Sequence, residues 1–247
     1  APLDAPTCLR AAAPLLGDPV RGVRIEAANV LADLPDSDIP EYRRAERQTA
    51  LQEYEAALAL DADWPAVNIN LGNLRLRQGR PAEAVAAYQR AIRIDPRYAG
   101  GYVNLADAWR QQGKDAEAEQ VLRQGLATLP QVADLHHALG LLLVRQNSRD
   151  AALTELAEAA RLAPGSARYD YVYAIALDSA GRRSEALTRL RGALQRHPGD
   201  LDILGALVSM NREAGDRQAA LRYAKQAAAL LPGNAELAQL VASLEAR

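Results

Sequence analysis

The residue types that most often carry catalysis or bind metals are few in this chain and are poorly spaced for either role. The adjacent pair His136 and His137 lies roughly 100° apart around a helix, and therefore not on one face. His197 precedes Pro198, where a cation suits a helix end, and none of the three histidines has a Cys, Glu or His partner four residues on. The single cysteine, Cys8, lies among apolar residues, as a small buried side chain does. We therefore expect no catalytic site, no metal site, no cofactor and no enzyme activity.

Composition and charge exclude several further classes of protein. In 247 residues, 29 Lys and Arg stand against 31 Asp and Glu, which gives a net charge of −2. A binder of nucleic acid or of an anionic membrane surface needs a basic excess, so neither partner is expected. The chain has no run of about 18 apolar residues, so no membrane span is predicted. Phe is absent, and a core of Ala, Leu and Val favours closely packed helices.

Small residues and prolines recur through the chain at intervals of 34 residues. The four ladders are Pro96, Pro130, Pro164, Pro198 and Pro232; Gly79, Gly113, Asn147, Gly181 and Gly215; Ala84, Ala118, Ala152, Ala186 and Ala220; and Ala91, Gly125, Ala159, Ala193 and Ala227. A fixed period of this length is typical of a solenoid, in which one structural unit is repeated and stacked.

Each period contains the signals for two helices and the turn between them. From Pro65 the apolar residues follow helical spacing until Gly79, which favours the left-handed backbone that ends a helix. Pro81 suits the first turn of the second helix, and Pro96 prevents that helix from continuing. The predicted N-caps of three later helices are Ser166, Asp200 and Asn234. Because one such hairpin cannot bury its own apolar face, the hairpins must stack on each other.

The residues of one period resemble the tetratricopeptide repeat (TPR). The matching residues are Asn68, Leu71, Gly72, Arg75, Ala84, Tyr88, Ala91 and Pro96, with Tyr102 and Trp109 at aromatic packing positions of the next unit. The resemblance implies an all-α fold, a right-handed superhelical solenoid of helical hairpins. Five full units are predicted at residues 65–98, 99–132, 133–166, 167–200 and 201–234, and residues 235–247 resemble the helix that caps such arrays.

The first 64 residues follow the period less closely. Residues 41–64 are predicted to be the second half of a degenerate unit, because Ala50 and Tyr54 fall in register. Residues 1–34 resemble a HEAT repeat, with two helices joined by a tight Asp-Pro turn, and residues 35–40 form the predicted linker. Within 41–64, arginines at 43, 44 and 47 are interleaved with glutamates, which predicts a solvated helix face.

The order of a HEAT-like segment followed by TPR units is similar to the C-terminal region of bacterial multihaem cytochrome-c-type TPR proteins. No Cys-x-x-Cys-His haem site lies within the chain, so any redox centre would belong to other sequence. The chain begins at Ala1 without Met, and a lone HEAT-like unit leaves an apolar edge open, so we expect further chain to precede it. The resemblance favours the bacterial periplasm, with the cytoplasm as the alternative.

In TPR arrays the first helix of each unit lines a concave groove, and the resemblance implies which residues of this chain face it. The predicted peptide-binding residues are Asn70, Asn73, Arg77, Asn104, Asp107, Arg110, Gln111, His137, Arg168, Tyr171 and Asp178. Over all groove positions, five arginines balance five acidic residues. A neutral groove favours an uncharged or mixed-charge peptide over nucleic acid.

Two asparagines define the predicted mode of binding. Asn70 and Asn104 resemble the asparagine ladder that TPR arrays of protein O-GlcNAc transferases use against an extended peptide backbone, since an amide pairs with both N–H and C=O. The ladder ends there, because Ala138, Val172 and Ala206 occupy the equivalent sites. The lysine with which chaperone-type TPR domains hold a C-terminal carboxylate is also missing. The alternative is that the two amides bond between adjacent units.

These observations predict a non-catalytic scaffold that binds a protein or an extended peptide in the concave groove. The alternative is a structural or assembly arm of a larger enzyme or multihaem electron-transfer protein, whose active domain lies outside this chain. Self-association through the open N-terminal edge or through the cap helix is a further prediction.

Overall fold

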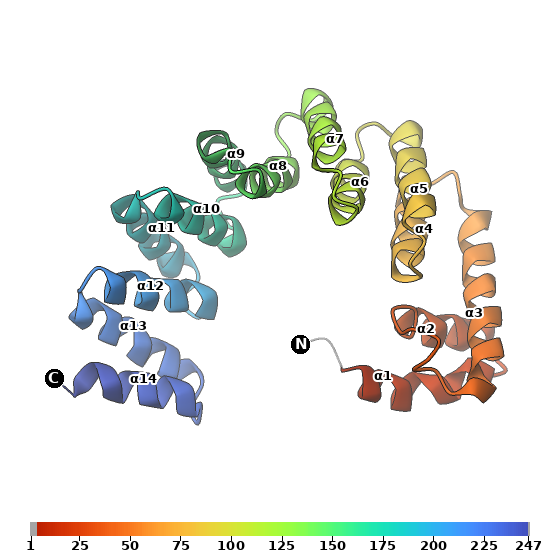
Figure 1. The fold of residues 1–247 in the computed structure, drawn as a ribbon, viewed down its shortest axis with the longest axis horizontal. Helices are drawn as coiled ribbons and strands as arrows, with labels where there is room; N and C mark the ends of the chain where they lie inside the picture. The colour runs from red at the N-terminus through yellow and green to blue at the C-terminus, as the bar shows by residue number, and fades with distance from the viewer. Residues whose placement is uncertain (1–3, 247) are drawn as a thin grey trace. The chain divides into compact units, whose positions relative to one another are not determined.

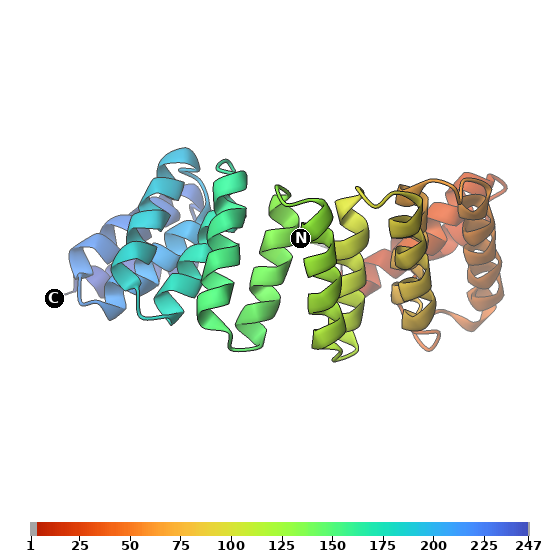
Figure 2. The ribbon, with the colours of Figure 1, turned by 90° about the horizontal axis from the view of Figure 1, so that it is seen from above.

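All regular structure in this protein is helical. The computed structural model describes residues 4–246, and within them it contains fourteen α-helices, one 3-10 helix and no strand. The predicted all-α fold is therefore confirmed. The chain divides into two compact units, residues 1–130 and residues 131–247, and in each of them successive helices fold back on one another (Figures 1 and 2). None of the described helices is both long and apolar enough to cross a membrane.

The helices of both units follow the predicted period. The first unit contains α1 (Ala5–Ala12), the 3-10 helix η1 (Ala13–Gly17), α2 (Arg21–Val30), α3 (Glu41–Leu60), α4 (Pro65–Arg77), α5 (Pro81–Ile94), α6 (Ala99–Gln111) and α7 (Asp115–Thr128). The second contains α8 (Ala133–Arg145), α9 (Arg149–Leu162), α10 (Ala167–Ser179), α11 (Arg183–Arg196), α12 (Leu201–Glu213), α13 (Arg217–Leu230) and α14 (Ala235–Glu245). From α4 to α13, helices of 13 and 14 residues alternate, so each period forms one hairpin.

The predicted turn and capping chemistry is confirmed. The residues that end the first helix of the hairpins have left-handed backbone, with φ of 70° at Gly79 and 60° at Asn147. Asn is the non-glycine residue that adopts this conformation at least cost. Ser166, Asp200 and Asn234 each accept a hydrogen bond from a backbone N–H three residues on, which satisfies a donor at the start of the following helix.

Small residues allow the two helices of a hairpin to approach closely. A Cβ atom placed on Gly72 of α4 would lie 2.3 Å from the ring of Tyr88 on α5, which is fully buried. The ladder that begins at Ala84 is buried throughout the array, with exposures of 0–1%. The small residues thus serve packing, because a larger side chain at these positions would push the helices apart.

Three hairpins bury a polar residue where the second hairpin packs Tyr102. Asn68 donates from its amide to the carbonyl oxygens of Ala62 and Trp64, at 2.7 and 3.0 Å. The ring Nδ1 of His136 lies 2.6 Å from a carboxylate oxygen of Glu155. At the third such position, the carboxylate of Asp170 pairs with two arginines. A buried polar group needs hydrogen-bonding or charged partners, and each of these three polar residues has them.

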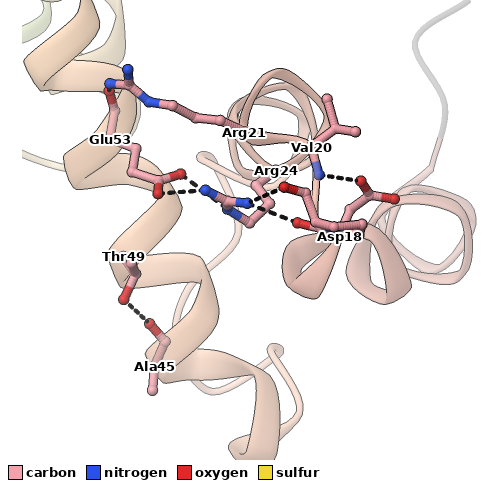
Figure 3. Close-up of polar contacts among 8 residues, drawn as sticks. Asp18, Val20, Arg21, Arg24, Ala45, Thr49 and Glu53 are labelled. Atoms are coloured by element: carbon pink, nitrogen blue, oxygen red, sulfur yellow. Dashed lines mark hydrogen bonds and ion pairs between the residues drawn. The ribbon is translucent and has the colours of Figure 1, made fainter.

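Arg24 holds the N-terminal helices against α3. Its guanidinium donates to the Glu53 carboxylate at 2.6 and 3.1 Å and to the backbone oxygen of Asp18 at 2.8 Å, as Figure 3 shows. Arg21, one turn earlier on α2, donates to the backbone oxygen of Glu53. The hydrogen bond with Arg24 lowers the pKa of the Glu53 carboxyl, so the pair stays ionised at neutral pH. That residues 1–34 are HEAT-like stays a prediction.

One expectation about α3 is wrong. Arg47 was expected on a solvated face with Arg43 and Arg44, but its side chain is only 8% exposed. The segment after α2 lies against it, so Arg47 pairs with the Asp36 carboxylate at 3.1 Å and lies 3.5 Å from the carbonyl oxygen of Ala32. A buried guanidinium requires such partners.

Both tryptophans of the chain lie in the first unit. Trp64 precedes α4 and is 67% exposed, although its backbone oxygen accepts a bond from Asn68. Trp109 on α6 is half-buried, and the Lys114 ammonium lies 4.6 Å from its ring centre, close enough for a cation–π contact.

Candidate functional site

The predicted peptide-binding residues lie on the first helices of four hairpins. Seven are on α4 and α6 in the first unit, and four are on α8 and α10 in the second. Because α4 and α6 pack directly against each other, Asn70 and Asn104 belong to neighbouring helices. Asn70 is exposed and Asn104 half-buried, and within residues 4–246 neither amide makes a side-chain hydrogen bond. The alternative in which the two amides bond to each other is therefore not seen.

Other polar residues of α4 and α6 are engaged in short-range contacts. Asn73 accepts a hydrogen bond from the Tyr88 hydroxyl at 2.7 Å, and Asp107 pairs with Arg110 at 3.1 Å. Burial, together with the nearby Asp107 carboxylate, raises the pKa of Tyr88 to about 12, so the hydroxyl keeps its proton and remains a donor. Gln111 is exposed at the end of α6. Binding by these residues stays a prediction.

Arg77 connects two elements of the fold. Its guanidinium donates to the backbone oxygen of Asn29 at 2.8 Å and to the Asn29 side-chain oxygen, and it lies 3.8 Å from Asp33. The end of α4 is thereby tied to the end of α2. A ligand that used Arg77 would compete with these contacts, because the same guanidinium donors are occupied.

His137 lies on α8, where a neighbouring ring covers it. Its side chain is buried at 6% exposure, and the ring of Tyr169 from α10 covers it at a centre-to-centre distance of 4.6 Å. The hydroxyl of Tyr169 also donates a hydrogen bond to the Asp134 carboxylate, and a direct contact of His137 with a peptide stays a prediction. Burial, helped by the positive charge of Arg168, lowers the pKa of His137 to about 4. The ring is therefore neutral at physiological pH.

Tyr171 borders an apolar cleft in the second unit. We call this cavity, of about 370 Å³, the α8–α10 cleft. Its apolar walls are formed by Leu141 and Val144 of α8, Leu153 and Leu156 of α9, and Tyr171, Val172 and Ile175 of α10. Leu141 is 41% and Val144 46% exposed, which is unfavourable for large apolar side chains in water. Concave apolar surface of this kind is the usual form of a binding site.

The surroundings of the cleft include a pair of packed rings and a close contact between helices. Near the first turns of α8 and α10, Tyr169 and His137 fill the space between the two helices. A Cβ atom on Gly140 would come within 2.7 Å of Leu156, so α8 packs closely on α9 at that point. Val144 of α8 and Ala176 of α10 are among the residues that line the cleft.

The remaining predicted residues of α10 differ in their surroundings. Arg168 is exposed and forms no ion pair with any residue that the structure describes. Asp178 accepts a hydrogen bond from Arg183 at 2.6 Å, and Arg183 also reaches Glu213 on α12 at 2.6 Å. Hydrogen bonding to the Asp178 carboxylate, with a further contribution from Glu213, raises the pKa of Arg183, so its guanidinium stays protonated.

Sequence reasoning missed part of the cleft. Tyr171 is one of the predicted groove residues and Val172 occupies the position equivalent to Asn70 and Asn104, whereas Leu141, Val144 and Ile175 are not among the predicted contacts. A signal was present, because the run from Leu139 to Val144 is apolar on every side of the helix apart from Gly140. Such a helix has apolar positions left over after one face is packed. Within residues 4–246, no three His, Cys, Asp or Glu side chains are placed to hold a metal ion.

Comparison with protein families identifies the repeated hairpin. Two family models described as tetratricopeptide repeat match the chain, one at residues 75–142 and the other at residues 41–99 and 137–182. Together they span residues 41–182, which is more than half of the chain. No curated protein matches the sequence. The similarity to multihaem cytochrome proteins is not shown by these matches and stays a prediction.

Solved structures show the same fold at low sequence identity. MamA from Desulfovibrio magneticus is 20% identical, with a TM-score of 0.58 over 71% of this chain and 98% of that one. YrrB, described as a TPR protein with an unusual peptide-binding site, is 22% identical, with a TM-score of 0.56 over 76% of this chain and 97% of its own. Yeast Tom70 is 20% identical, with a TM-score of 0.69 over 93% of this chain and 47% of Tom70.

Proposed function

The chain belongs to the tetratricopeptide-repeat family, a family of protein-interaction scaffolds, and on this premise we propose that it binds a segment of a partner protein through the inner surface of its first helices. In the second unit the α8–α10 cleft takes an apolar side chain of that segment. In the first unit, taken by itself, the amides of Asn70 and Asn104 pair with the backbone of an extended segment. No catalytic step is part of this function.

The observation that carries the proposal is the exposed apolar lining of the α8–α10 cleft. Burial of apolar surface contributes roughly 25 cal/mol per Å², so covering Leu141, Val144 and Tyr171 favours binding of an apolar group. Tyr171 adds a rigid ring with few rotamers to lose, which suits a contact anchor. The peptide-binding site named for YrrB, a protein of the same fold, is consistent with this role.

A peptide selection tests the proposal. A random peptide library is displayed and selected on the full chain, and the affinities of the recovered peptides are measured for the wild type and for Ile175→Ser. We expect peptides with a shared aliphatic or aromatic residue, and a loss of affinity of about tenfold or more in the variant. Removing one anchor from an apolar pocket has an effect of this size.

The matched control is Leu230→Ser on α13, because Leu230 is 44% exposed and lies outside the α8–α10 cleft. An equal loss of peptide affinity in Ile175→Ser and Leu230→Ser would show that the peptides bind exposed apolar surface in general. Recovery of peptides without an apolar residue would also contradict the proposal.

A further inference from the structure

The helix α11 contains more arginines than any other helix of the second unit. Within Arg183–Arg196 it contains four arginines and a single acidic residue, Glu185. Glu185 is held by Arg182 through two hydrogen bonds of 2.7 Å, so it does not neutralise the rest of the helix. Arg189 and Arg196 both reach back towards α10.

The two arginines share one buried carboxylate. Asp170 of α10 is 1% exposed, its Oδ1 lies 2.7 Å from Nε of Arg189, and its Oδ2 accepts a hydrogen bond from Nη2 of Arg196. Two guanidiniums against one carboxylate leave one positive charge uncompensated. The arginine side chains are 34% and 45% exposed, so that charge is accessible from solvent.

Most of the hydrogen-bond donors of the two arginines are unused. A guanidinium has five N–H donors, and Asp170 engages one nitrogen of each arginine. The other donors bond to no residue between 4 and 246. Asp170 also restricts the rotamers of both side chains, so an anion that binds there meets donors that are already in place.

These donors border a second cavity, which we call the α10–α11 cleft. It has a volume of about 520 Å³ and is lined by Arg189 and Arg196 together with Tyr173, Leu177, Ser184, Thr188 and Gly192. Glu185 also lines it, with its carboxylate held by Arg182. The Arg189 guanidinium lies 5.5 Å from the centre of the Tyr173 ring, and this contact also fixes its position.

The α10–α11 cleft is distinct from the proposed peptide site. Tyr173, which borders it, is two residues from Tyr171 in the α8–α10 cleft. Two residues correspond to roughly 200° around a helix, so the two clefts lie on different sides of α10.

We propose that the α10–α11 cleft is a docking site for an acidic segment of a partner protein, whose carboxylate binds Arg189 and Arg196. The two guanidiniums select an anion, and the apolar side chains of Tyr173 and Leu177 suit the stem of a glutamate or aspartate better than a bare counterion. The proposal does not depend on the α8–α10 cleft.

Binding of a fluorescent glutamate decapeptide to the full chain tests this site, with a glutamine decapeptide as the uncharged probe. We expect the glutamate peptide to bind preferentially and Arg196→Gln to weaken it about tenfold, since a charge-assisted hydrogen bond is lost. Arg196→Gln leaves Asp170 paired with Arg189, so the buried carboxylate keeps a partner. The matched control is Arg191→Gln, which removes the same charge from an exposed position of α11.

Equal weakening by Arg191→Gln would overturn the proposal, because the peptide would then recognise only the basic helix. A second measurement uses the unaltered protein and so does not depend on a variant that folds. In nitrogen-15 spectra, the Nε–H signals of Arg189 and Arg196 are expected to shift on addition of the glutamate peptide, while that of Arg191 stays. Shifts at Arg191 alone, or no difference between the two peptides, would contradict the site.

Discussion

At the scale of single residues, the chain shows how a repeat tolerates polar side chains in its packed positions. Asn68, Tyr102, His136 and Asp170 follow one another at intervals of 34 residues. Each has a partner that a neighbouring turn or helix supplies, and the partner positions follow the period as well. Asn68 and Tyr102 both bond to the carbonyl oxygen six residues earlier, and Glu155 beside His136 stands 34 residues before Arg189 beside Asp170. The chemical type of the partner, a carbonyl, a carboxylate or a guanidinium, therefore distinguishes otherwise similar hairpins.

The amides of Asn70 and Asn104 are predicted to contribute to binding individually. We expect Asn70→Ala and Asn104→Ala each to lower the affinity for a selected peptide by roughly two- to tenfold, the effect of one lost hydrogen bond. Gln124→Ala on the exposed side of α7 is the control and is expected to leave affinity unchanged. Unchanged binding in both asparagine variants, measured by calorimetry, would show that the amides do not contact the peptide.

His137 is predicted to make stability depend on pH. Its pKa is about 4 in the fold, lowered by burial and by Arg168 against the opposing effect of Asp134, and about 6.5 in the unfolded chain. The unfolded state therefore binds a proton first as the pH falls. The contribution of neutral His137 to the free energy of unfolding is complete above pH 6.5. It is lost as the pH falls towards 4, by up to roughly 1.4 kcal/mol per pH unit.

The variant His137→Phe keeps a ring beside Tyr169 but cannot titrate. The difference in unfolding free energy between wild type and variant, from urea titrations at pH 7 and pH 4.5, is expected to move in favour of the variant at the lower pH. Other titrating groups are present in both proteins and cancel in this difference. A constant difference across this range would mean that His137 is protonated equally in both states.

At the scale of the elements, the close packing of a hairpin depends on glycine where its two helices touch. Gly72→Ala is expected to destabilise the protein by about 1–3 kcal/mol, because the new methyl group would lie 2.3 Å from the ring of Tyr88. The control is Gly205→Ala in α12, where a Cβ atom meets nothing within 4 Å. That change is expected to stabilise by about 0.5–1 kcal/mol, since alanine restricts the unfolded chain.

Denaturant unfolding of the two alanine variants measures both effects. Opposite signs are the expected outcome. If both variants were destabilised, the effect of the packing clash could not be distinguished from the effect of helix propensity.

The hairpins are predictable from sequence because their determinants are local. Gly79, Pro81 and Ser166 each act within a few residues, so the helix ends follow from the chain itself. The contacts of Arg77 with Asn29 are not predictable in this way, because the two residues are 48 apart and Asn29 lies outside the period.

The α8–α10 cleft is predictable only in part. The resemblance indicates that Tyr171 lies on the inner surface, but the space beside it depends on tertiary packing of α8, α9 and α10. Two contacts in that packing are Gly140 on Leu156 and the ring of Tyr169 over His137. The first repeats the contact of Gly72 with Tyr88 two periods earlier, whereas the ring pair is a contact between α8 and α10 that the period does not indicate.

At the scale of the whole molecule, a stacked array distributes its stability over neighbouring units. The damage from Gly72→Ala is therefore expected to stay local. Hydrogen exchange is expected to be faster in α4 and α5 of this variant and unchanged in α12 and α13. A uniform increase through all four helices would show that the array unfolds as one cooperative body.

The division into two units has a spectroscopic consequence. Trp64 and Trp109 both belong to the first unit, and the second contains no tryptophan. Fluorescence excited at a wavelength that only indole absorbs therefore follows the melting of residues 1–130 alone, whereas far-ultraviolet circular dichroism sums the helices of both units. Coincident melting curves would make the protein two-state, and separate curves would give each unit a transition of its own without any cut in the chain.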